Sequence, residues 1–304
     1  MIVRPRPSLL QLFLVRHGAI LPRILPQIVL FTGISAAVVL GHKIIPSFVP
    51  GHPPGPYALI GIALSIFFSF RNNACYERWW EARIQWGHLF LATRGLSRQT
   101  LVLEPDAAAE RQRILTLAMA FTQALVLHLR PSASSEKVER HLTDADRASF
   151  RSGVNRPDML ARLIAEELAR LQASGRISDI LYQLLDRSLG DMAAVQGACE
   201  RIRNTPVPYI YNLLLQRTTY LFCLFLPLGF VDTLGWSTVI ATALITYTFF
   251  GLDALGDELE QPFGVRPNHL PIGALADTIE VELRDALGET ALPPLPRPVD
   301  YLLM

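Results

Sequence analysis

The chain has 304 residues, of which 50% are hydrophobic and 18% are charged, and its formal net charge is +1. Its mean hydropathy of +0.28 is higher than a soluble domain needs to cover one core, so we expect a membrane protein whose charges gather in a water-facing part. The nearly neutral charge and the absence of a nucleic-acid-binding motif argue against a nucleic-acid partner.

The N-terminal segment, residues 1–23, carries four arginines around a short apolar stretch. No small-residue cleavage site leads into a polar mature domain, so the segment does not have the pattern of a signal peptide. We expect it to be retained as an amphipathic helix that is cytosolic or lies at the membrane interface.

Four apolar stretches reach the length of about 17 to 25 residues that a helix needs to cross the hydrocarbon core. They cover residues 24–41, 53–70, 207–231 and 234–252, which predicts transmembrane pairs within 24–70 and 207–252. Buried helices of a soluble domain are the alternative. Arg217 interrupts the third stretch and is costly in lipid, so we expect a carboxylate partner such as Asp253 or Glu258, or a turn at the interface.

The loops within each pair are short and nearly free of charge, whereas the N-terminus and residues 71–206 are rich in arginine. The positive-inside rule therefore predicts a multi-pass protein of the inner (plasma) membrane, with both termini and the central segment in the cytoplasm.

The central segment, residues 71–206, has the periodicity of soluble helices at 111–130 and 158–171, and Ser178 is a plausible N-cap for a helix that ends near residue 204. Residues 130–155 are polar and predict a long excursion between helices. Residues 253–290 are expected to form a C-terminal cytosolic segment. The proline-rich tail, residues 291–304, is expected to be disordered or strapped along a neighbouring protomer.

The second apolar stretch passes without a helix breaker into a collar of aromatic and charged residues, Arg71-Asn72-Asn73-Ala74-Cys75-Tyr76-Glu77-Arg78-Trp79-Trp80-Glu81. Such a collar is typical of a membrane interface, where tryptophan and tyrosine rings anchor a helix. Arginines there meet lipid headgroups or carboxylates of a partner.

This collar resembles the second-span signature of bestrophins, and the bacterial branch in particular. The resemblance continues, in the same order, with Thr205-Pro206-Val207-Pro208-Tyr209 and with an acidic stretch that ends in Pro262-Phe263-Gly264. It covers roughly residues 1 to 285. The resemblance implies an all-α membrane protein that assembles as a homopentamer, with four transmembrane helices per protomer, a helical cytosolic body and one axial pore.

Ile62, Ile66 and Phe70 recur at four-residue spacing and share one helix face. By resemblance this stripe lines the pore neck, where stacked apolar rings close a pore by excluding water. From the residues alone, packing against other helices or lipid is the simpler interpretation. The resemblance also points to Ile180 as a second, cytosolic constriction, with an ordinary core isoleucine as the alternative.

Ser65 and Ser69 share another face of the same stretch, beside Gly61. Small residues at this spacing favour close helix packing, although the hydroxyl groups could instead meet passing ions.

Four acids, Asp253, Asp257, Glu258 and Glu260, follow the fourth apolar stretch and are candidates for an interface or an ion vestibule. Animal bestrophins carry a run of acids after Pro-Phe-Gly as a calcium clasp, whereas Val265-Arg266 follows here. We therefore expect no calcium gating, no metal site and no cofactor.

No catalytic motif is present, and the three cysteines and seven histidines follow no metal-binding pattern, so we expect no enzyme. We predict an ion channel for small monovalent ions, with cations favoured because the calcium clasp of the anion-conducting animal members is missing. An anion channel and a non-conducting membrane scaffold or sensor are the alternatives. A secondary transporter would show an inverted repeat or broken helices, and neither is seen.

Overall fold

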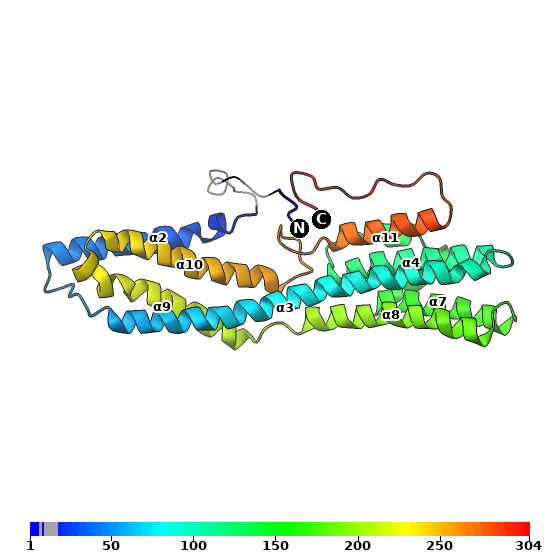
Figure 1. Ribbon diagram of the computed structural model, residues 1–304, viewed down its shortest axis with the longest axis horizontal. Coiled ribbons are helices and arrows are strands. Elements are labelled where there is room, and N and C mark those ends of the chain that lie inside the picture. The colour runs from blue at the N-terminus through cyan, green and yellow to red at the C-terminus, as the bar shows by residue number, and fades with distance from the viewer. Residues whose placement is uncertain (6–7, 9–17) are drawn as a thin grey trace. The chain divides into compact units, whose positions relative to one another are not determined.

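The computed structural model describes residues 1–5, 8 and 18–304, and within them it forms helices with no strand beyond isolated bridges (Figure 1). The helix predicted for residues 1–23 lies largely outside the described residues. The chain divides into two compact units. Unit 1 comprises Met1–Arg4, Trp80–Thr205 and Pro262–Met304, and unit 2 comprises Pro5–Trp79 and Pro206–Gln261.

Unit 2 contains the four apolar stretches. They form α2 (Leu21–Ile44), the first part of α3 (Gly55–Gln99), α9 (Tyr209–Leu234) and α10 (Ser237–Glu260). Phe31, Phe68, Phe222 and Phe249 are buried in a common core that all four helices supply.

Helix α3 runs without interruption for 45 residues and includes the aromatic and charged collar. No proline occurs between Pro56 and Pro105, so nothing in the sequence removes a backbone donor from this helix. The predicted passage of the second apolar stretch into the collar without a break is confirmed. The predicted domain boundary after residue 70 therefore falls inside a helix, and the division between the two units comes after Trp79.

Unit 1 is built around α4 (Ala108–Leu129), which packs against α7 (Arg156–Ala173) and α11 (Ile272–Ala286). Helix α7 packs in turn against α8 (Asp179–Asn204). The helix predicted at residues 111–130 is confirmed, and it lies in the core, since Ile114, Leu117 and Phe121 are all 0% exposed. From Leu117 to Leu127 every residue of this helix is buried, so α4 is a central helix rather than an amphipathic surface helix.

Among the residues that the structure describes, five helices are long and apolar enough to cross a membrane by length and composition, and α4 is the one that we did not predict. In α4, 78% of the most apolar 18-residue stretch is buried inside the protein, against 22–44% of the corresponding stretches in α2, α3, α9 and α10. A helix that other helices of the same unit cover on every side is apolar all round because all of its faces are buried.

Ser178 is the N-cap of α8, as predicted, and its side chain accepts a hydrogen bond from the Leu181 amide. The polar excursion over residues 130–155 was only partly right, because it contains α5 (Glu136–Glu139) and α6 (Asp144–Ser152). Thr143 and Asp146 form a capping box at the start of α6, a local signal that the sequence analysis passed over.

Helix α10 continues to Glu260, so the boundary predicted after residue 252 falls inside a helix and the acidic residues are helical. A short 3-10 helix, Thr100–Leu103, follows α3. The last residues of the tail pair with the first residues of the same chain: the Val3 amide donates to the Tyr301 carbonyl, and the Leu303 amide donates to the Met1 carbonyl.

Candidate functional site

The predicted apolar stripe lies on the outer face of α3. Ile62, Ile66 and Phe70 are 59%, 50% and 65% exposed, whereas Leu64 and Phe68 on the same helix are buried in the core of unit 2. Packing against the chain's own helices therefore does not explain the stripe. Lipid, a second copy of the chain or a water-filled path remain as its surroundings.

Of the small residues on α3, Gly61 lies at a close helix contact, whereas Ser65 and Ser69 are exposed. A Cβ at Gly61 would lie 3.2 Å from the ring of Phe222, so glycine allows a close approach of α9. The Ser65 hydroxyl donates to the Gly61 carbonyl at 2.8 Å, which returns it to its own helix.

Ile180 is the second residue of α8 and is 72% exposed, so the alternative of an ordinary core isoleucine is wrong. Its position follows from the cap, because Ser178 starts the helix two residues earlier. An exposed isoleucine fits either a constriction or an interface between copies.

A buried arginine follows directly after the stripe. The Arg71 side chain is 0% exposed, and it donates from Nη1 to Asp253 Oδ1 and from Nη2 to Asp257 Oδ1, each at 2.6 Å. Asn72 adds a bond from its amide to the Leu252 carbonyl at 3.2 Å. These contacts, which we call the Arg71 clamp, fix the end of the stripe to α10 inside unit 2.

Close approach of the two helices depends on Gly256. A Cβ there would lie 2.6 Å from the Asn72 Oδ1 atom and 3.1 Å from the Arg71 guanidinium carbon. Only a residue without a side chain fits between these groups.

The acidic cluster is largely occupied by partners within unit 2. Arg23 also binds Asp257. The Glu260 carboxylate accepts from the Val207 amide and from the Asn212 side chain, both at 3.1 Å. Glu258 is partly buried as well. An open vestibule of free carboxylates, which would have favoured cations, is therefore not what the structure places here.

Arg217 does not bind Asp253, as we had expected it could. Asp253 is held by Arg71 and by the Gln216 side chain. Arg217 is exposed on α9, and within the described part of the chain it makes no ion pair. The expectation failed because Arg71, which is fully buried, has the stronger need of a carboxylate.

Residues 262–270 contain the Pro-Phe-Gly motif and are organised by a second buried arginine, in unit 1. Arg130 donates to the carbonyls of Phe263, Gly264 and Leu270, each at 2.7 Å. Burial lowers the pKa of Arg130. The sequence analysis missed this role, and no spacing rule would have joined residue 130 to this loop. Among residues 1–5, 8 and 18–304, no group of three or more His, Cys, Asp or Glu side chains could hold a metal ion.

Several known proteins are similar to this chain over most of its length. A family model described as "Bacterial/Fungal Bestrophin protein" matches residues 1–285. A voltage-dependent anion channel-forming protein of Mesorhizobium japonicum is 43% identical over 97% of this chain and 95% of its own. One from Escherichia coli K12 is 36% identical over 96% of each chain.

The crystal structure of a bacterial bestrophin homolog from Klebsiella pneumoniae matches with a TM-score of 0.85 and 35% identity, over 88% of this chain and 100% of that one. The predicted all-α membrane fold is confirmed by this likeness, and the relatives are named as channel-forming proteins rather than enzymes. An ion channel is therefore supported, whereas our preference for cations is not.

Proposed function

The chain belongs to the bacterial/fungal bestrophin family, and we propose that it assembles as a homopentamer that conducts small monovalent anions through one axial pore. The relatives that carry the name of anion channel-forming proteins match nearly all of their own length here. Anion conduction was the alternative in the sequence analysis, and it replaces the cation reading.

The observation that carries the proposal is the exposed apolar stripe on α3. Three large apolar side chains stand outside the core on one face, and the Arg71 clamp holds the end of that face in place. In a ring of copies, Ile62, Ile66 and Phe70 would form stacked apolar rings that admit ions only when water fills the neck. Ile180 would form a second, cytosolic ring.

The charge balance beside the stripe gives no advantage to cations. Asp253 and Asp257 are neutralised by Arg71 and Arg23, so they offer little negative field to a passing ion. The wider arrangement that we propose has α2, α3, α9 and α10 crossing the inner membrane, with lipid around them and both termini in the cytoplasm.

The test is single-channel recording of the purified protein in a planar bilayer under an asymmetric NaCl gradient. We expect a reversal potential close to that of chloride. We also expect Ile66→Ala to give larger or more frequent openings, because a smaller side chain widens and wets the neck. Ile60→Ala, an exposed isoleucine of α3 outside the stripe, is the matched control and should leave the conductance unchanged.

A reversal potential near that of sodium would refute anion conduction but keep the channel. No unitary current from intact, inserted protein would refute the channel and favour the scaffold or sensor. If Ile66→Ala and Ile60→Ala change the conductance equally, the assignment of the pore neck to the stripe on α3 is refuted. The number of copies is read separately from the mass of the purified assembly.

A further inference from the structure

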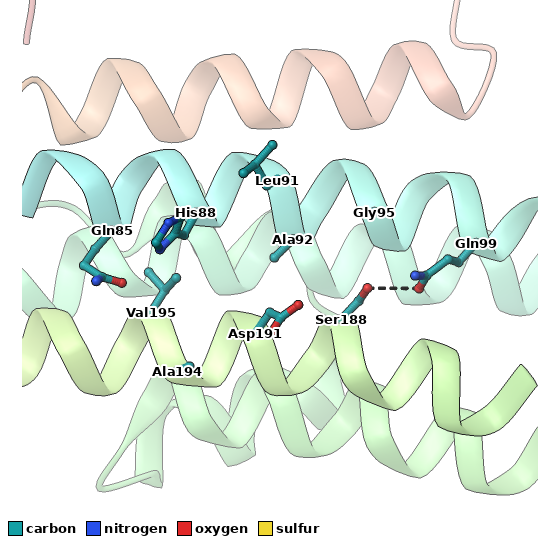
Figure 2. A pocket seen from close by; sticks show the side chains of 10 residues that line it. All are labelled: Gln85, His88, Leu91, Ala92, Gly95, Gln99, Ser188, Asp191, Ala194 and Val195. Carbon is teal, nitrogen blue, oxygen red and sulfur yellow. Dashed lines mark hydrogen bonds between the residues drawn. The ribbon is translucent and has the colours of Figure 1, made fainter. Parts of the chain in front are cut away.

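A half-open cavity of about 460 Å³ lies inside unit 1, between α3 and α8 (Figure 2). Its polar lining comes from both helices and consists of Gln85, His88, Gln99, Ser188 and Asp191. Figure 2 shows His88 of α3 and Asp191 of α8 pointing into the space between the helices. The cavity therefore brings together two ionisable groups of opposite character.

The neutral side chains of the lining are partly occupied. The Ser188 hydroxyl donates to Gln99 Oε1 at 2.9 Å, and the Gln85 amide donates to Glu81 at 2.8 Å. The first bond leaves the amide nitrogen of Gln99 available as a donor to an occupant of the cavity.

His88 and Asp191 differ from these neighbours. Both are exposed, and among the described residues neither takes part in a hydrogen bond or an ion pair. Two ionisable groups without protein partners would be costly inside a dry interface between copies of the chain. His88 and Asp191 are instead well suited to a surface of the ion path that water and ions reach.

The cavity lies on the face of α8 that carries the proposed cytosolic constriction. On α8, Ile180, Leu184 and Asp191 follow one another at spacings that keep them on one face.

We propose that this cavity is a binding site for a small monovalent anion in the wall of the cytoplasmic part of the ion path, and that His88 and Asp191 together set its charge. The inference rests on the proposed function. With His88 neutral, the Asp191 carboxylate dominates and repels anions. With His88 protonated, its ring N–H groups and the Gln99 amide donate to the anion, and the charge of Asp191 is offset.

Other charged groups stand near the cavity. Arg187 lies one turn before Asp191 on the same face of α8. On α3, Arg83 lies over Gly87, and Arg94 is bound by Glu282 of α11. Glu81 is paired with Arg201 of α8. Among side-chain types, histidine is the one used by proteins as a switch between pH 5 and 8, so the proposal assigns the response to His88.

The first experiment measures reversal potentials in an NaCl gradient with the cytoplasmic side at pH 8.0 or pH 5.5. For wild type, the chloride-to-sodium permeability ratio should rise on the order of three-fold on acidification. This is the effect expected when each copy gains one unit charge about 10 Å from the ion in screened water. His88→Gln should hold the ratio constant. Asp191→Asn should keep it high at both pH values.

His128→Gln is the matched control, because His128 lies in the same unit but is paired with Glu200. It should retain the response of the wild type. A wild type with anion currents that do not change with cytoplasmic pH, or a His88→Gln variant that still responds, would overturn the inference.

The second experiment tests whether the cavity faces the path. A thiol introduced by His88→Cys is treated with anionic or cationic methanethiosulfonate reagents, which should shift the reversal potential in opposite directions. The native thiols Cys75, Cys199 and Cys223 are all 0% exposed, so wild type is the unmodified control. Normal anion currents that the reagents leave unchanged would show that a neighbouring copy covers the cavity, which refutes the site alone. A wild type without any current refutes the proposed function, and the site with it.

Discussion

Removal of the Arg71 guanidinium is the perturbation whose cost follows most directly from the structure. Arg71→Met keeps the length of the side chain but leaves Asp253 and Asp257 without their shared cation. The Arg71 side chain is 0% exposed, and the two carboxylates are 15% and 27% exposed. Breaking a buried pair by removing one partner costs about 3–5 kcal/mol, because the remaining charge is uncompensated. Arg23 still meets Asp257, so we expect about 3 kcal/mol, the lower end of that range.

The assay is the free energy of unfolding in detergent, followed by tryptophan fluorescence. Arg147→Met is the control, since its partner Asp144 is 98% exposed and such a surface pair contributes about 1 kcal/mol or less. The double variant Arg71→Met with Asp253→Asn should recover part of the loss, because it removes a carboxylate left unpaired. A loss for Arg71→Met no larger than for Arg147→Met would refute the clamp.

Three further predictions concern single positions. Gly256→Ala should destabilise the protein by about 1–3 kcal/mol in the same assay, because its Cβ would meet Asn72 at 2.6 Å. Burial alone would raise the pKa of Glu280, but His141 and Arg140 lower it to about 2, so its contribution to stability is complete above its ordinary pKa and is lost as pH falls from about 4.5 towards 2. Glu280→Gln should flatten that part of the acid-unfolding curve, and an unchanged curve would contradict the assignment. Burial raises the pKa of Cys199 to about 12, so iodoacetamide at pH 8 should label it only after unfolding, as read by mass spectrometry.

The length and polarity of the segments predicted much of the fold. Four long apolar stretches became α2, the first part of α3, α9 and α10, and Ser178 was correctly identified as a helix start. These features are local, since hydrophobic length and capping chemistry are set by neighbouring residues. The central position of α4 was by contrast not predicted, because its burial depends on helices distant in sequence.

Side-chain partners were the part that sequence could not supply. Arg71 and Asp253 are separated by 182 residues, and nothing in either segment specifies the other. Arg217 was equally plausible as a partner from composition alone. The choice is made by burial, because the arginine with no access to water must have carboxylates and the exposed one need not. That Ile62, Ile66 and Phe70 share one helix face was by contrast within reach of periodicity, although their proposed role came from the family resemblance.

The preference for cations came from the missing calcium clasp of the animal members, which says nothing about the charge along an ion path. The acids after the fourth span do not supply a negative field either, because Asp253 and Asp257 face Arg71 and Arg23 within unit 2. A carboxylate that is paired with an arginine at 2.6 Å acts on a distant ion as a dipole. The field of a dipole falls off with distance far faster than that of a free charge. Apolar rings such as those proposed for α3 discriminate little by sign. The proposed selectivity therefore falls to unpaired groups on exposed faces, such as those of the proposed site at His88 and Asp191.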